Sequence, residues 1–81
     1  MKVGSLVMFK SPGFTDAIFL RDHLTWTELR GRVLDGDVCI VLEIEDRGHV
    51  STSADVKVLS SQGFVGWTLS NYFKVIVDEA G

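Results

Sequence analysis

The segment Gly63–Ile76 constrains the fold more than any other part of the sequence. Phe64–Thr68 and Phe73–Val77 are rich in β-branched and aromatic residues, which is the composition of strands. The four residues Leu69–Tyr72 between them predict a tight turn of about one helical turn. We therefore expect the chain to end in a strand, a turn and a closing strand that shuts a small β-barrel.

Three earlier segments also have the pattern of strands. Val38–Glu45 is apolar at every position in its first half and alternates in its second half, as in a strand that is covered on both faces and then wet on one. Ser5–Lys10 and Asp55–Leu59 complete the set. Five short strands with tight connections predict one all-β domain over residues 1–81, a five-stranded antiparallel barrel.

The segment Ser11–Asp37 is predicted to be a long loop after the first strand. Its apolar run Ala17–Leu20 fits a short strand and a buried helix equally well. Loops of this length in a small domain usually have a function or carry structure of their own.

A helical turn near residues 25–31 is predicted within this long loop. Thr25–Glu28 has the spacing of a capping box, which favours the start of a helix. Gly31 and the hairpin signal Asp35–Gly36 count against that helix.

The charge and composition of the chain disfavour several classes of protein. Eight basic residues face eleven acidic ones, giving a net charge of -3, whereas nucleic-acid binders usually present a basic face. The single cysteine, Cys39, allows no disulfide within the chain. With no secretory pattern and no apolar run that could span a bilayer, we expect a cytoplasmic protein, in the host cytoplasm if it is viral.

No set of residues in the sequence predicts catalysis, a cofactor or a metal. Cys39 lies in an apolar strand and is expected in the core, while Asp22 and His23 are adjacent and would not form a dyad. The spacing of the two histidines and one cysteine matches no zinc site. Asp35–Asp37 lacks the remaining ligands of a calcium loop. We expect a protein that is not an enzyme.

The C-terminal segment Gly66–Ile76 resembles the corresponding part of Src-homology-3 domains, in which a Ser-Asn-Tyr one-turn helix precedes the last strand. The residues in matching places are Gly66, Ser70, Asn71, Tyr72 and Ile76. Through Lys2–Val7 and Val38–Ile44 the chain also resembles small proteins of tailed bacteriophages, particularly those that infect marine cyanobacteria. The resemblance implies a Src-homology-3-like barrel.

Binding of proline-rich segments, which the resemblance implies, finds little support in the residues. Such a groove needs several aromatic rings and a proline before the Ser-Asn-Tyr turn, and only Tyr72 is matched. Leu69 stands in place of the proline, the first strand offers Met8 and Phe9 instead of tyrosines, and Ser60–Gln62 contains no tryptophan.

We therefore predict a non-enzymatic interaction module, encoded by a phage, that binds a protein. The hypothetical contact surface consists of aromatic residues from the long loop and the C-terminal segment: Phe14, Phe19, Trp26, Trp67 and Tyr72. The alternative is that the apolar loop residues only cover one end of the barrel, and Trp67 fits the core and the surface equally well. A second copy of the chain is a further candidate partner.

A small nucleic-acid-binding barrel of the ribosomal or transcription-factor type is the alternative function. Its support would be four lysines on one face: Lys2, Lys10, Lys57 and Lys74.

Overall fold

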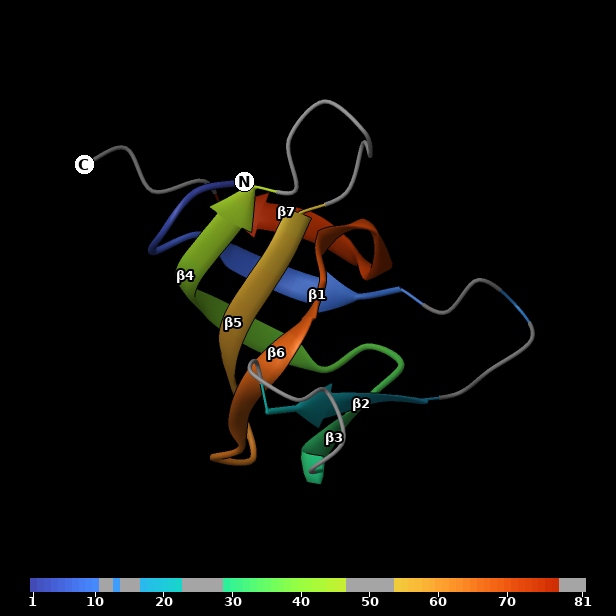
Figure 1. Ribbon diagram of the computed structural model, residues 1–81. Helices are drawn as coiled ribbons and strands as arrows, with labels where there is room; N and C mark the ends of the chain where they lie inside the picture. Colours follow the sequence, from blue (N-terminus) through green and yellow to red (C-terminus); the bar gives the residue numbers. More distant parts are fainter. Residues whose placement is uncertain (11–12, 14–16, 23–28, 47–53, 78–81) are drawn as a thin grey trace.

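A computed structural model describes residues 1–10, 13, 17–22, 29–46 and 54–77. These residues form seven β-strands and one short 3-10 helix, η2 (Figure 1). The strands are β1 (Leu6–Phe9), β2 (Ala17–Arg21), β3 (Leu29–Leu34), β4 (Val38–Asp46), β5 (Ala54–Ser60), β6 (Val65–Leu69) and β7 (Phe73–Val77), and η2 spans Ser70–Tyr72.

All seven strands belong to one antiparallel sheet with the order β3-β2-β6-β5-β4-β1-β7. The all-β class is therefore confirmed. The prediction of a closed, five-stranded barrel is wrong, because within the described part of the chain no pairing joins the end strands β3 and β7. The two additional strands, β2 and β3, come from the segment that was predicted to be a loop.

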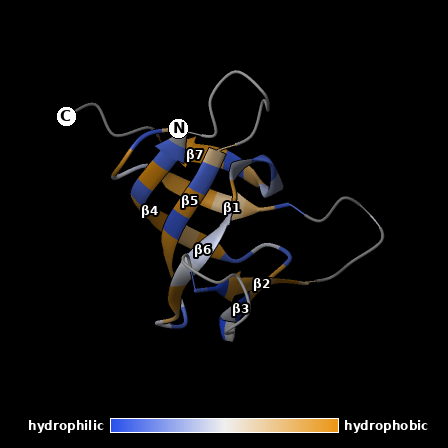
Figure 2. Ribbon diagram, viewed as in Figure 1, coloured by the Kyte–Doolittle hydropathy of each residue, from blue (hydrophilic) through white to orange (hydrophobic). Residues whose placement is uncertain are grey.

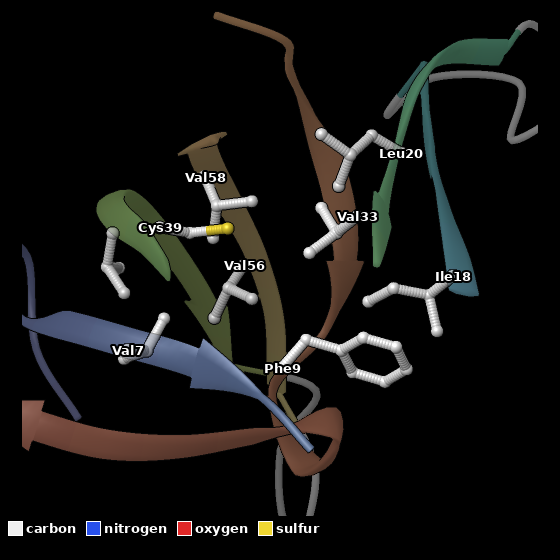
Figure 3. Close-up of a cluster of buried hydrophobic side chains, with 9 residues drawn as sticks. Val7, Phe9, Ile18, Leu20, Val33, Cys39, Val56 and Val58 are labelled. Carbon is white, nitrogen blue, oxygen red and sulfur yellow. The ribbon is translucent and has the colours of Figure 1, made fainter. Parts of the chain in front are cut away.

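The sheet curls around a single buried cluster although it does not close. Phe9 of β1 and Val33 of β3 belong to this cluster, although their strands lie near opposite ends of the sheet order. The buried members are Val7, Phe9, Ile18, Leu20, Val33, Cys39, Val41, Val56 and Val58 (Figure 3). Buried and exposed positions alternate along most strands, because successive side chains of a strand point to opposite faces of the sheet. Hydropathy alternates with them along β4 and β5, so that the apolar side chains gather on the inner face (Figure 2).

The β2–β3 hairpin replaces part of the predicted loop Ser11–Asp37. Ile18, Leu20 and Val33 point inward and are buried, whereas Phe19 and Arg32 are exposed. This period of two belongs to strands that are half buried. The strand interpretation of Ala17–Leu20 is therefore the correct one.

Residues 29–31 of the predicted loop form part of a strand and not the end of a helical turn. Leu29, Arg30 and Gly31 lie in β3, so the helical turn predicted over residues 25–31 is wrong at its end; Thr25–Glu28 lie outside the described residues. The turn at Asp35–Gly36 is confirmed, since the Asp37 N–H donates to the Leu34 carbonyl at 2.9 Å. It is not a hairpin turn, because β3 and β4 are not neighbours in the sheet.

Gly66 lets the hairpin lie close to β6. Among the described residues, the hairpin pairs with the rest of the sheet at one position, Arg21 with Trp67. A Cβ atom at position 66 would lie 2.7 Å from the Leu20 Cβ and 3.2 Å from the Arg30 Cβ. Only a residue without a side chain permits this approach of the β2–β3 hairpin to β6.

The C-terminal prediction is confirmed in its local structure. β6, the 3-10 turn Ser70–Tyr72 and β7 follow one another as expected. The Ser70 hydroxyl accepts a hydrogen bond from the Ala54 N–H at 2.9 Å, and the Tyr72 carbonyl accepts one from the Lys10 N–H at 3.0 Å. These two bonds tie the turn to β5 and to the end of β1.

Candidate functional site

Basic side chains gather on the outer face where β5, β6 and β2 lie side by side. The register pairs Trp67 with Lys57 on one side and with Arg21 on the other, so the indole stands between two cations. Arg30 of β3 lines the same recess, which has a volume of about 300 Å³. We call it the basic recess; its lining is Arg21, Asp22, Arg30, Lys57, Val65, Gly66 and Trp67.

The carboxylates of Asp22 and Glu43 lie at this recess: Asp22 lines it, and Glu43 pairs with Lys57. Lys57 Nζ lies 3.1 Å from Glu43 Oε2, and both side chains are solvated. Exposed ion pairs of this kind contribute less than about 1 kcal/mol to the free energy of unfolding. An incoming carboxylate therefore competes for Lys57 at little cost.

A second hollow, the aromatic pocket, lies between the hairpin and the β5–β6 connection. It has a volume of about 320 Å³ and is lined by Phe19, Gly31, Arg32, Gln62 and Phe64. Most of its lining surface is apolar. With the basic recess, it gathers four of the eight basic residues of the chain: Arg21, Arg30, Arg32 and Lys57.

The structure places three of the five residues predicted for the contact surface. Phe19 lies in the aromatic pocket with its side chain 47% exposed, and Trp67 is half buried in the basic recess. Phe14 and Trp26 lie outside the described residues. The question whether Trp67 is core or surface is thus answered: it lies on the outer face and is partly covered.

Tyr72 belongs to different surroundings. Its ring meets Phe9 edge to face, with 6.4 Å between the ring centroids and 88° between the planes. It packs against the buried cluster and is not among the residues that line the basic recess. Tyr72 is half-buried, as is Trp67, and a contact surface shared by the two residues stays a prediction.

Sequence reasoning missed the arginines and Phe64. Arg30 and Arg32 flank Gly31 in a pattern of alternation, which indicates a strand with two cations on one face. The same residues also fit the end of the helical turn predicted over residues 25–31, so the alternation alone does not decide the element. The four lysines proposed for nucleic-acid binding do not form one group, since Lys57 lies on β5 and Lys74 on β7, with β4 and β1 between them.

Cys39 is buried, as predicted, and its thiol is not activated. Its side chain is 1% exposed. Burial and then the neighbouring carboxylate of Asp37 raise the pKa of Cys39 from 9.0 to about 11. A nucleophilic cysteine needs the opposite shift, toward the thiolate.

This pKa makes the stability of the fold depend on alkaline pH. Between 9.0 and about 11 the unfolded chain ionises its thiol while the folded chain does not, so the free energy of unfolding falls as pH rises, by at most about 1.4 kcal/mol per pH unit. Urea unfolding across this range in wild type and Cys39→Ala measures the effect. The other titrating groups are common to both chains, so a steeper loss in wild type is expected, and parallel pH profiles would contradict it.

Within the described ranges, no three His, Cys, Asp or Glu side chains are grouped so that they could hold a metal ion. The described segments also contain no helix of the length and apolar character needed to cross a membrane.

Comparisons of the chain with protein-family models, curated proteins and solved structures gave no match.

Proposed function

We propose that the chain is a non-enzymatic, Src-homology-3-like interaction module, encoded by a tailed bacteriophage, that binds an acidic segment of a protein in the host cytoplasm. The resemblance is supported by the 3-10 turn Ser70–Tyr72 between β6 and β7. The binding proposal depends on one observation. Trp67 lies in register between Lys57 and Arg21, with Arg30 beside it, in a chain whose net charge is -3.

The local concentration of cations determines that the binding partner carries negative charge. Cations gathered on one face attract an opposite charge and speed its encounter, whatever the net charge of the chain. Tryptophan and arginine are also the residues most enriched where binding energy concentrates. Trp67 with Arg21 and Arg30 therefore combines an apolar contact with charge recognition.

A protein segment suits this face better than a nucleic acid. Phosphate chains bind through many cation contacts at once, whereas the recess holds three basic side chains with the carboxylates of Asp22 and Glu43 close by. An acidic peptide carries fewer charges and adds apolar contacts. A single-stranded nucleic acid is the second candidate, because bases stack on aromatic rings that cations flank, as at Trp67.

Reversing the charge of Arg30 tests the proposal. Arg30→Glu is expected to weaken binding of a short fluorescein-labelled peptide of alternating glutamate and glycine at least about tenfold, because a like charge then faces the ligand. Lys74→Glu is the matched control. It makes the same change in net charge, at an exposed residue of β7, the opposite end strand of the sheet. Fluorescence anisotropy at low and physiological salt measures both.

Three results would count against the proposal. Equal losses in the two variants would mean that binding follows net charge alone. No binding of the peptide by wild type would remove the acidic partner. Tighter binding of an oligothymidine, lost in Arg30→Glu and kept in Lys74→Glu, would assign the face to single-stranded nucleic acid.

A further inference from the structure

The aromatic pocket is held open by the packing of Phe64 on Gly31. A Cβ atom at Gly31 would lie only 2.3 Å from the Phe64 Cγ, so the ring occupies the space that a side chain at position 31 would take. Phe64 nevertheless remains 37% exposed. The ring is therefore a fixed wall of the pocket.

The turn that carries Phe64 is held by its own hydrogen bonds. The Ser60 hydroxyl accepts hydrogen bonds from the N–H groups of Gln62 at 3.2 Å and Phe64 at 3.1 Å. The Ser60 N–H donates to the Phe64 carbonyl at 2.8 Å, and the Gln62 side-chain amide donates to Asp37 Oδ2 at 3.3 Å. A wall that is ordered before binding loses little entropy when a ligand enters.

A cation stands beside the opposite wall of this pocket. Arg32 is exposed, and it is the cross-strand partner of Phe19. Across the described segments no carboxylate forms an ion pair with it. The pocket therefore offers two exposed rings and a guanidinium, which suits an apolar side chain whose neighbours in the sequence are acidic.

The aromatic pocket and the basic recess are neighbours along β3. Arg30 lines the recess and Arg32 lines the pocket, and positions two apart on a strand lie about 7 Å from each other along the chain. One extended segment is therefore long enough to reach both hollows with side chains a few residues apart.

We propose that the aromatic pocket takes a single large apolar side chain, best an aromatic one, that lies within the acidic segment bound by the basic recess. This proposal rests on the proposed function and adds to it a preference for one kind of acidic segment. Charge at Arg21, Arg30 and Lys57 attracts acidic segments in general, and the walls Phe19 and Phe64 select those that carry an apolar anchor.

A second copy of this chain is a poor occupant of the same pocket. A symmetric dimer through this face would bring the identical surface of each copy together. The arginines of the two copies, Arg30 and Arg32, would then face like charges, which costs free energy. The occupant that the charge favours is a different chain with acidic residues.

Two peptides separate this inference from the function on which it rests. The first is the peptide of alternating glutamate and glycine; the second has one central glycine replaced by phenylalanine. The anchored peptide is expected to bind wild type about tenfold more tightly, the effect of burying part of a phenylalanine. That gain is expected to disappear in Phe19→Ser, while Arg30→Glu weakens both peptides.

Ile76→Ser is the matched control for Phe19→Ser. Its side chain is 46% exposed and lies on β7, whereas that of Phe19 is 47% exposed, so both variants remove an exposed apolar group at little cost to folding. Equal affinities of wild type for the two peptides, or a gain that survives Phe19→Ser, would overturn the anchor pocket and leave the acidic partner standing. If neither peptide binds, the proposed function fails, and the anchor pocket fails with it.

Discussion

Replacing Phe9 by alanine is expected to lower the free energy of unfolding by about 3–5 kcal/mol. Phe9 is fully buried, and its ring meets both Tyr72 and Phe73 at a centroid distance of 6.4 Å. The alanine would leave a cavity between β1, the β2–β3 hairpin and the C-terminal turn. A small domain has a free energy of unfolding of about 5–15 kcal/mol, so this loss leaves the folded state only marginally stable.

Urea unfolding followed by tryptophan fluorescence measures the effect of Phe9→Ala, since the chain has two tryptophans. Phe19→Ala is the control: it removes the same ring from a side chain that is 47% exposed, and a loss below about 1 kcal/mol is expected because little buried surface is involved. A loss of similar size in the two variants would mean that Phe9 does not occupy the centre of the core.

The strands that were predicted from sequence are those whose pattern and flanking turns agree. Val38–Glu45 was predicted and β4 spans Val38–Asp46; Phe73–Val77 was predicted with the bounds that β7 has. The Ser70–Tyr72 turn was predicted from a short motif that leaves the backbone little choice. Local composition decides such segments, and it is fully visible in the sequence.

The open sheet and the β2–β3 hairpin were not predicted, for a different reason. β2 and β3 are short, and Gly31 in β3 argues against regular structure when only neighbours in sequence are considered. The glycine has a role only in the folded chain, where the Phe64 ring lies on it. A contact between residues 31 and 64 leaves no local pattern, so the sequence suggested a loop.

The candidate site depends on the same non-local contacts. Phe19 was selected as an exposed aromatic, and the structure places it beside Arg32. The row of Lys57, Trp67 and Arg21 requires the register of three strands. Because the sequence left both a strand and a helix open for Ala17–Leu20, Arg21 had no predicted neighbour across the sheet.

The second large effect is expected from Gly66→Val, which should lower the free energy of unfolding by about 3 kcal/mol. Strand statistics predict the opposite sign, since valine favours strands and glycine in a strand is destabilising by about 0.5–1 kcal/mol. Packing determines the sign of the change in stability, because the new Cβ would lie 2.7 Å from the Leu20 Cβ and 3.3 Å from the Arg21 backbone nitrogen. Neither atom is the end of a flexible side chain, so the hairpin has to move away from β6.

Hydrogen exchange distinguishes this movement from a general loss of stability. In Gly66→Val the amides of β2 and β3 should exchange faster than those of β4 and β5, because a single strand pairing among the described residues, Arg21 with Trp67, joins the hairpin to β6. Gly63→Ala is the control: a Cβ there meets no atom within 4 Å, and its φ of +91° gives a local backbone cost alone. If Gly66→Val were as stable as wild type, or if exchange rose equally in all strands, the close approach of the hairpin to β6 would be wrong. The basic recess and the aromatic pocket would then lose their shape, since each is lined by residues from both sides of that contact.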